Sequence, residues 1–218
     1  MQLRTDISRR EVVDTTAMPW VASPSPGVER RMLERQGDEV ARATTVVRYA
    51  PGSRFATHTH DMGEEFLVLD GVFQDEHGDY PAGAYVRNPW GTSHAPRSAD
   101  GCTILVKLRQ MHPEDQARVA THIDDVAATP SDAVPGLSRR PLHRFGAEQV
   151  ELEVWSPGSG GVERTWDHGA ELFVLDGALA DEDGTYGAGT WIRIPPGSTH
   201  TPTAPDGARV WVKHGHLR

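Results

Sequence analysis

The feature that most constrains the fold is an internal duplication of the chain. The segment PGSRFATHTHDMGEEFLVLDG begins at Pro51 and resembles PGSGGVERTWDHGAELFVLDG, which begins at Pro157. The resemblance continues at the same offset of 106 positions (157 minus 51), with DEHGDYPAGAYVRNPWGTSHAP from Asp75 and DEDGTYGAGTWIRIPPGSTHTP from Asp181. A repeat of this length predicts two copies of one domain rather than a solenoid of short units.

Each repeat is rich in short segments that are typical of β-strands. These segments are apolar, often β-branched, and bounded by Gly, Pro, Asp or Asn, as in FLVLDGVF, GAYVRNP and GCTILVKLRQ. VERRMLER and EVARATTVVRYA flank QGD, which predicts a hairpin. Only HPEDQARV is expected to form a short turn of helix. The expected fold is therefore all-β, with a barrel or sandwich in each repeat.

The best candidate for a linker is the Pro- and Ala-rich segment DDVAATPSDAVPGLSRRP. A chain of 218 residues is long enough for two small domains. We therefore expect an N-terminal domain over residues 1–125 and a C-terminal domain over residues 126–218.

Composition limits the expected compartment and partners. The formal net charge is -9 and no block of Lys or Arg stands out, so nucleic acid is not an expected partner. No apolar run is long enough to span a membrane, and the N-terminal segment MQLRTDISRREVV lacks the apolar core of a signal peptide. The single cysteine, Cys102, excludes an internal disulfide and a Cys-x-x-Cys zinc site. These features favour a cytoplasmic protein.

Four potential metal ligands in the first repeat have spacings that would bring them together. His58 and His60 are two residues apart, so in a strand they point to the same face. Glu64 begins the next apolar strand, and His94 follows a Pro-x-Gly turn after another strand. Three neutral imidazoles and one carboxylate suit divalent Zn, Fe, Mn, Ni or Cu. Glu65 lies on the opposite strand face from Glu64, so it is expected to face solvent or to support a ligand.

These segments resemble the two motifs of the cupin superfamily. The first motif is matched by G-x5-H-x-H-x3-E-x6-G from Gly52 to Gly71, and the second by G-x5-P-x-G-x2-H from Gly83 to His94. Ser98 stands where the second motif often has Asn. More narrowly, MPW, EEFLVLDG, GDYPAG and GCTILVK resemble the ChrR-type cupins, over most of residues 15–112 and more weakly over residues 140–218.

The resemblance implies two tandem cupin barrels, each a double-stranded β-helix or jelly roll. It also implies one divalent metal ion in the first barrel, with zinc and iron as leading candidates and Mn, Ni and Cu as alternatives. By this resemblance, the metal ligands are His58, His60, Glu64 and His94.

The second repeat lacks most of this ligand set. Arg164, Trp166 and Ala170 occupy the equivalent positions, and His200 alone keeps its counterpart. An arginine is permanently cationic and repels a divalent ion. The C-terminal barrel is therefore expected to be a degenerate cupin without a metal, acting as a structural lobe or as a pocket lined by Trp166, Trp191 and Arg164.

A shifted metal site in the second repeat is the alternative. It would use His168, Glu171 and His200. His168 aligns with Met62 and Glu171 with Glu65, so the strand would have to slip by one residue. Such a slip inverts every side chain of the strand, which argues against this site.

Four residues of the first repeat are candidates for the walls of a ligand pocket: Phe66, Tyr85, Arg87 and Trp90. An aromatic residue such as Phe66 is equally what a core contains. Arg87 has an equivalent, Arg193, in the repeat without the metal set. Both a ligand-binding role and a structural salt bridge therefore stay open for Arg87.

The resemblance is compatible with functions of different classes. Relatives include iron-dependent dioxygenases that cleave a carbon–carbon bond in β-diketones or hydroxylated aryl ketones, which implies an enzyme acting on a small chelating carbonyl compound. The alternative is a zinc-binding, non-catalytic regulatory module, as in the ChrR anti-sigma factors. No sigma-binding helical domain with its zinc-binding cysteines is recognisable in this sequence. An isomerase of sugars or small metabolites is a third alternative.

A small-molecule ligand or substrate is therefore the expected partner. Two fused barrels could imitate a cupin dimer within one chain, or two chains could form a homodimer through exposed strands. The sequence leaves both arrangements open.

Overall fold

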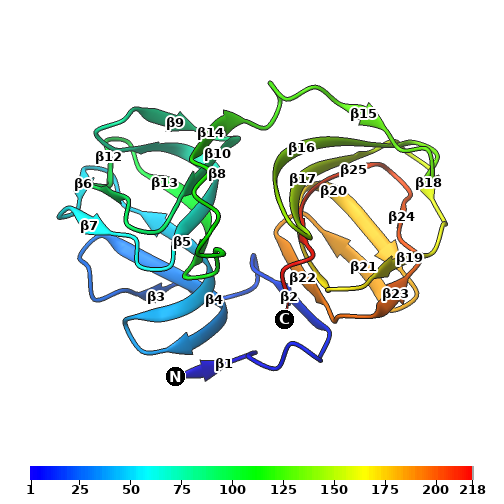
Figure 1. The fold of residues 1–218 in the computed structure, drawn as a ribbon, viewed down its shortest axis with the longest axis horizontal. Helices are drawn as coiled ribbons and strands as arrows, with labels where there is room; N and C mark the ends of the chain where they lie inside the picture. The colour runs from blue at the N-terminus through cyan, green and yellow to red at the C-terminus, as the bar shows by residue number, and fades with distance from the viewer. Residues whose placement is uncertain (218) are drawn as a thin grey trace. The chain divides into compact units, whose positions relative to one another are not determined.

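The computed structural model describes residues 1–217 as two units of antiparallel β-structure (Figure 1). Unit 1 comprises residues 1–5 and 18–123, and unit 2 comprises residues 6–17 and 124–217. The all-β prediction is confirmed, because the regular elements of the described residues are all strands. The short helical turn expected in HPEDQARV does not form, and no described segment is a helix that could cross a membrane.

Unit 1 has one large sheet and a two-stranded sheet that pairs β7 with β11. The path of the large sheet is β1-β4-β5-β13-β8-β10-β14, and β4 and β5 form the predicted hairpin. Its strands are β1 (Gln2–Leu3), β3 (Val21–Ala22), β4 (Val28–Gly37), β5 (Ala41–Tyr49), β6 (Ser53–Arg54), β7 (His58–Thr59), β8 (Glu64–Gln74), β9 (Asp79–Pro81), β10 (Ala84–Asn88), β11 (Ser93–His94), β12 (Arg97–Ser98), β13 (Cys102–Leu108) and β14 (Val119–His122).

Unit 2 repeats this topology, with the path β15-β16-β17-β25-β20-β22-β2 and a two-stranded sheet that pairs β19 with β23. The duplicated sequence therefore produces a duplicated barrel. Its strands are β2 (Glu11–Asp14), β15 (Thr129–Pro130), β16 (Leu137–Phe145), β17 (Glu148–Trp155), β18 (Ser159–Gly160), β19 (Arg164–Trp166), β20 (Ala170–Asp181), β21 (Gly184–Gly187), β22 (Thr190–Ile194), β23 (Ser198–His200), β24 (Thr203–Ala204) and β25 (Ala208–His214).

The barrel interiors follow from the alternation of side chains along each strand. In unit 1, Phe66 and Val68 of β8, Val86 of β10, and Ile104 and Val106 of β13 belong to one buried cluster. An equivalent cluster fills unit 2. The residues between these positions point to the other face of their sheet, so their side chains do not enter the barrel interior.

The leading strand of each repeat pairs with the barrel of the other repeat. β2 pairs with β22, with Glu11 opposite Arg193, and β14 pairs with β10 with Val119 opposite Arg87. We call residues 6–17 the N-terminal arm. Because the arm belongs to unit 2, the units differ from a simple division of the chain at residue 125. Strand patterns in a sequence do not reveal which barrel an edge strand will complete.

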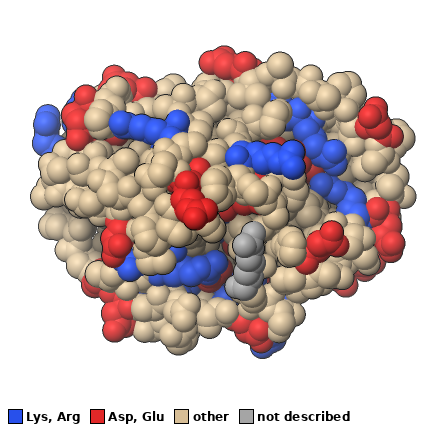
Figure 2. Space-filling model, viewed as in Figure 1, with Lys and Arg blue, Asp and Glu red and all other residues tan. Residues whose placement is uncertain are grey.

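Side chains of the arm strengthen this pairing. The guanidinium of Arg10 lies 2.6 Å from Oδ2 of Asp181 and donates a hydrogen bond of 2.9 Å to the hydroxyl of Tyr186. The side chain of Asp181 is almost fully buried, so the nearby cation of Arg10 offsets the cost of burying its negative charge. The arm is therefore an integral part of the unit 2 barrel. On the face drawn in Figure 2, basic and acidic side chains are interspersed over the surface.

Candidate metal centre

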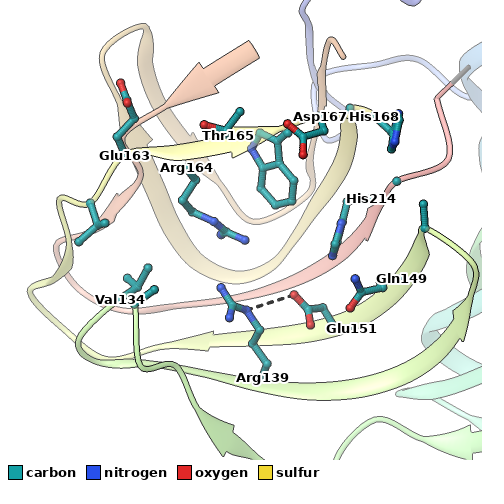
Figure 3. Close-up of a pocket in the computed structure, with 16 residues that line it drawn as sticks. Val134, Arg139, Gln149, Glu151, Glu163, Arg164, Thr165, Asp167, His168 and His214 are labelled. Atoms are coloured by element: carbon teal, nitrogen blue, oxygen red, sulfur yellow. Dashed lines mark ion pairs between the residues drawn. The ribbon is translucent and has the colours of Figure 1, made fainter. Parts of the chain in front are cut away.

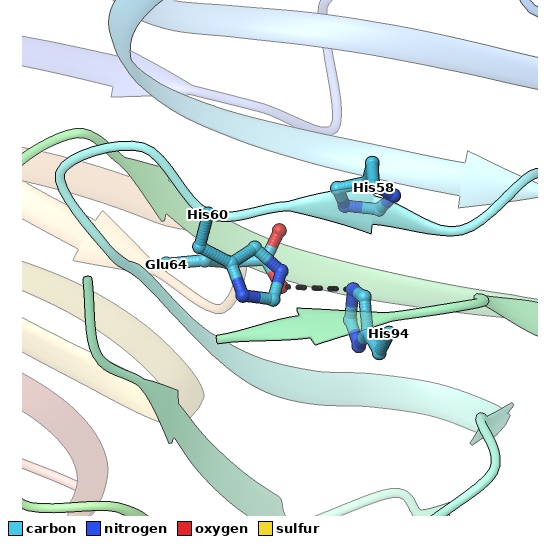
Figure 4. A group of neighbouring side chains, drawn as sticks. All are labelled: His58, His60, Glu64 and His94. Carbon is cyan, nitrogen blue, oxygen red and sulfur yellow. Dashed lines mark ion pairs between the residues drawn. The ribbon is translucent and has the colours of Figure 1, made fainter. Parts of the chain in front are cut away.

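The four predicted ligands converge inside unit 1 (Figure 4). One donor atom from each of His58, His60, Glu64 and His94 can be chosen so that all four lie within 4.8 Å of one another. Oε1 of Glu64 lies 3.5 Å from Nε2 of His60 and 3.4 Å from Nε2 of His94. Ligand bonds of about 2.0–2.2 Å place donor atoms roughly 3–4 Å apart around one ion, so the spacing suits a single metal ion.

Local backbone pairing brings these residues together. His58 lies directly opposite His94 in the β7–β11 pair. The amide of His60 donates a hydrogen bond to the carbonyl of Thr92, which ties the end of β7 to the loop before β11. Between His60 and Glu64, Gly63 adopts a φ of 77°, a left-handed conformation that turns the chain into β8. The short histidine strand and the carboxylate at the start of β8 thus meet across a tight turn.

Hydrogen bonds fix the orientation of two of the imidazoles. Nδ1 of His60 lies 2.9 Å from Oγ1 of Thr92, and this hydroxyl donates its own proton to the carbonyl of Pro89 at 2.7 Å. Thr92 therefore accepts the Nδ1–H of His60. Nδ1 of His94 lies 3.2 Å from Oδ2 of Asp75. In both rings the remaining nitrogen, Nε2, is left to point at the centre.

The two Nε2 atoms, of His60 and His94, are buried and have no hydrogen-bond partner among the described residues. Buried nitrogen atoms are rarely left unpaired, because the lost hydration costs free energy. A metal ion would satisfy both atoms, together with the carboxylate of Glu64. The donor set and its unpaired atoms therefore fit a bound divalent cation.

The electrostatic surroundings differ between the two oriented histidines. Burial lowers the pKa of His60, which favours the neutral imidazole that a metal requires. For His94, burial is outweighed by the hydrogen bond to Asp75 and the negative charge of Glu64, and the pKa is raised. Although burial opposes it, hydrogen bonds from His94 and the His77 amide lower the pKa of Asp75. Asp75 thus remains a carboxylate that holds His94.

A cavity of about 690 Å³ adjoins the four ligands. Its walls combine aromatic, aliphatic and charged side chains, among them Arg30, Tyr49, Phe55, Phe73, Val106 and Leu108. Burial raises the pKa of Tyr49 beyond any physiological range, so this phenol is a neutral wall. The cavity can therefore hold a small, partly aromatic molecule beside the metal position.

The four residues predicted to line the pocket do not line this cavity, which corrects that prediction. Phe66 packs in the core against Phe73, with ring centroids 4.6 Å apart. Trp90 donates its indole N–H to the carbonyl of Met111 at 3.1 Å. Tyr85 and Arg87 flank Val86 in β10, and since Val86 faces the core, both point to the other face of the sheet.

Arg87 has a structural role on that outer sheet face. Its guanidinium lies 2.6 Å from Glu65 and 2.6 Å from Asp115, and all three residues are buried. Tyr85 donates a further hydrogen bond of 2.9 Å to Glu65. Of the two roles left open for Arg87, the structure favours the salt bridge. Glu65 is buried rather than solvent-facing, and its carboxylate pairs with Arg87 and Tyr85.

The shifted metal site in unit 2 does not form. His168 is exposed, whereas Glu171 is buried and accepts a hydrogen bond from the indole N–H of Trp191 at 3.1 Å. Within residues 1–217, these two residues and His200 do not form a metal-binding group. Trp191 flanks the core residue Ile192 in β22, so it points to the other sheet face and lies outside the unit 2 cavity that the sequence assigned it to.

Two functional residues, Asp75 and Thr92, were not identified from the sequence. A signal for Asp75 was present, because the duplicated motif DE-x-G retains an aspartate, Asp181, in the second repeat. Oδ2 of Asp181 lies 3.3 Å from Nδ1 of His200, the same contact that Asp75 makes with His94. A pair retained in both repeats could have been read as a histidine and its orienting carboxylate.

Comparisons with known proteins agree with this architecture. The sequence profile of a family described as "ChrR Cupin-like domain" matches residues 8–112 and again residues 116–218. No curated protein matches the sequence. The second matched segment begins before β14, so each copy of the domain starts with the strand that pairs with the other barrel.

Solved structures share the fold at low sequence identity. A dioxygenase candidate from Nostoc punctiforme aligns with a TM-score of 0.81 and 16% identity, over 96% of this chain and 84% of that one. A candidate glyoxylate-induced protein from Pseudomonas aeruginosa aligns with a TM-score of 0.77 and 14% identity, over 100% of this chain and 92% of that one. Oxalate decarboxylase from Bacillus subtilis, studied for its Mn(II) centres, aligns with a TM-score of 0.63 and 12% identity, over 95% of this chain and 77% of that one. At these identities the similarity shows a common two-barrel fold.

Proposed function

The chain belongs to the ChrR cupin-like family and carries two copies of its domain, and we propose that it is a metal-dependent dioxygenase acting on a small chelating carbonyl compound. The observation that carries this proposal is the convergence of three imidazoles and one carboxylate, with two buried Nε2 atoms unpaired, at the wall of a cavity. We infer that the ion is iron, with zinc, Mn, Ni and Cu as alternatives.

The four ligands, His58, His60, Glu64 and His94, would hold the ion. When bound, it would supply a Lewis acid and an electron donor towards dioxygen. The chain itself contributes orientation, because Thr92 and Asp75 hold two of the imidazoles. It also excludes water, because the cavity walls beside the ligands include aromatic and aliphatic side chains.

Arg30 is placed to bind an ionised oxygen of the substrate. It lines the cavity, its side chain is largely buried, and its Nε has no hydrogen-bond partner. The carboxylate of Glu39 lies 3.7 Å from its guanidinium, too far for a hydrogen bond. An enolate held between Arg30 and the metal position would carry its apolar part against Phe55 and Tyr49.

The comparisons support this proposal at the level of the fold. A dioxygenase candidate and a Mn(II)-containing decarboxylase both have this two-barrel architecture. We place the activity in the cytoplasm, where a buried, unpaired thiol such as that of Cys102 stays reduced.

The second candidate function is a zinc-binding regulatory module without catalysis. The family relationship and the four-ligand set favour it, because four protein ligands close a tetrahedral zinc site. Such a module would bind a small molecule in the cavity and hold zinc tightly as isolated.

Oxygen consumption separates the two candidates. The protein is loaded with Fe(II) under anaerobic conditions, and oxygen uptake is recorded with a panel of β-diketones and aryl ketones. We expect uptake with at least one substrate, its loss in His94→Gln, and its retention in the matched variant His200→Gln in the second barrel. Tightly held zinc in freshly purified protein, with no uptake for any substrate, would contradict the dioxygenase and favour the regulatory module.

A further inference from the structure

The second barrel encloses a cavity of its own, with a volume of about 640 Å³ (Figure 3). It lies within unit 2 and does not involve the candidate metal ligands. Its lining includes two arginines, three carboxylates, two histidines and a tryptophan: Arg139, Arg164, Glu151, Glu163, Asp167, His168, His214 and Trp166. This cavity is therefore highly charged for the interior of a small barrel.

The charges arise from substitutions on one wall of the barrel. β5 carries Ala43, Thr45 and Val47 where β17 carries Gln149, Glu151 and Glu153, and the strands pair in the same register with β13 and β25. At the same offset, Leu108 is replaced by His214. Buried charges are costly unless they are paired or used. A barrel that had only lost its metal would be expected to fill with apolar side chains.

One of the two arginines is fully engaged within the wall. Arg164 donates from both terminal nitrogens to Glu153, at 2.9 and 2.7 Å, and Glu153 is completely buried. The same guanidinium lies 4.4 Å from the centre of the Trp166 ring. This bidentate pair fixes the indole as one side of the cavity and neutralises the deepest carboxylate.

The other arginine, Arg139, faces the cavity and can still donate hydrogen bonds to a ligand. Its Nε lies 3.2 Å from Glu151 and 3.4 Å from Glu153, and a terminal nitrogen lies 3.4 Å from the Ser131 hydroxyl. Its side chain is 32% exposed, and Figure 3 shows it beside Glu151. Arg139 lies opposite Glu153 in the sheet, as Arg30 lies opposite Val47 in the first barrel. Both cavities thus present an arginine at the same position.

We propose that the second barrel binds a small organic anion, whose carboxylate is held by Arg139 and whose aromatic or branched part lies against Trp166, Val134 and Val162. All four residues line the same cavity. A planar guanidinium binds a carboxylate through two parallel hydrogen bonds, and an indole face suits a flat apolar group.

Glu151 makes this site responsive to pH. Burial and the nearby charge of Glu153 raise its pKa to about 7, against the opposing charges of Arg139 and Arg164. Of the other titratable side chains that line the cavity, His214 lies on the strand paired with β17, and Glu163, Asp167 and His168 lie beside β19. A bound carboxylate next to Arg139 favours the protonated form of Glu151, so binding takes up a proton and weakens as the pH rises above 7.

Nuclear magnetic resonance on the full-length protein tests the proposal directly. The indole ¹⁵N–¹H signal of Trp166, assigned with Trp166→Phe, is followed while benzoate is added at pH 6.5. We expect saturable shifts with a Kd of about 1 mM or tighter. Benzyl alcohol and benzylamine, which match the ring but lack the negative charge, should bind at least tenfold more weakly.

Variants locate the binding site. Arg139→Gln should abolish the benzoate shifts, whereas the matched variant Arg30→Gln in the first barrel should leave them unchanged. Glu151→Gln should bind benzoate equally at pH 6.5 and 8, while the unmodified protein binds at least threefold more weakly at pH 8. Should Arg139→Gln fail to fold, the comparison of benzoate, benzyl alcohol and benzylamine on the unmodified protein still tests whether the site prefers an anion. Equal shifts with benzyl alcohol, or no shift with benzoate at about 10 mM, would overturn the proposal.

Discussion

Nδ1 of His94 lies 3.2 Å from Oδ2 of Asp75, and this contact leaves Nε2 of the histidine facing Oε1 of Glu64 at 3.4 Å. The carboxylate of Asp75 is itself held by the amides of His77 and Gly78, at 2.7 and 3.2 Å. The orientation of a candidate metal ligand is therefore set by a short turn outside the ligand motif. Such partners fix the tautomer of a histidine and tune its affinity for a metal.

Substitution of Asp75 should weaken metal binding while the four ligands remain in place. Asp75→Asn removes the charge that favours the Nδ1–H tautomer of His94, and we expect a loss in metal affinity of about 10- to 100-fold. Competition with a chromogenic chelator measures it. Asp181→Asn, the equivalent change beside His200 in the second barrel, is the control and should leave the affinity unchanged. Equal losses in both variants would indicate a general effect on folding.

One metal ion is expected per chain, bound by the first barrel. His60→Ala should remove most of the metal, because water cannot replace a ligand without weakening the chelate, whereas Trp166→Ala should leave the metal content unchanged. Inductively coupled plasma mass spectrometry of the purified proteins gives the ratio. Two ions per chain at full occupancy would contradict a second barrel without metal. Loss of metal only in Trp166→Ala would show that the barrels have been assigned the wrong way round.

The stability of unit 2 should fall as the pH rises towards 7. The folded state raises the pKa of Glu151 from 4.5 to about 7, so between these values it binds more protons than the unfolded state. This contribution to the free energy of unfolding is complete below pH 4.5 and is lost as the pH rises through 7, by about 3 kcal/mol.

Glu151→Gln tests this linkage, since an amide does not titrate. Chemical denaturation at pH 5 and pH 8 should show a smaller decrease in the free energy of unfolding for the variant than for the unmodified protein. Glu153, whose pKa is lowered chiefly by Arg164 against the effect of burial, acts in the opposite direction at lower pH. A decrease of the same size in both proteins would mean that another group titrates.

The N-terminal arm should stabilise unit 2 through its buried face. Val13 is 7% exposed and lies opposite Trp191, whereas its neighbour Val12 is 43% exposed. Val13→Asp buries a carboxylate without a partner and should lower the free energy of unfolding by about 2–4 kcal/mol, while Val12→Asp should change it by less than about 0.5 kcal/mol. Thermal unfolding followed by circular dichroism compares the two. Similar effects would show that the arm does not pack as described.

The ligand set was predictable because it depends on local rules. Residues two apart share a strand face, which placed His58 and His60 together, and the cupin motifs supplied Glu64 and His94. The pocket walls were not predictable in the same way. All five residues of β10 are buried, so burial patterns could not show that Tyr85 faces away from the cavity.

Long-range pairing explains the remaining differences. The arm at residues 6–17 looks like the start of the first domain, and only its register with β22 assigns it to the second unit. The charged cavity of unit 2 was missed for a related reason. Glu151 and Glu153 appear as ordinary acidic residues in the alternating segment EQVELEVW, and their burial follows only when β16 and β25 close over them.

The exchange of leading strands makes the two halves of the protein mechanically inseparable without unfolding. The polypeptide passes from one unit to the other at residues 5–6, 17–18 and 123–124, and a single protease cut between residues 113 and 118 would leave each fragment supplying an edge strand to the other fragment's sheet. The nicked protein should elute from a sizing column as one species and come apart only in denaturant. Neither fragment, expressed alone, would carry the edge strand that finishes its own sheet.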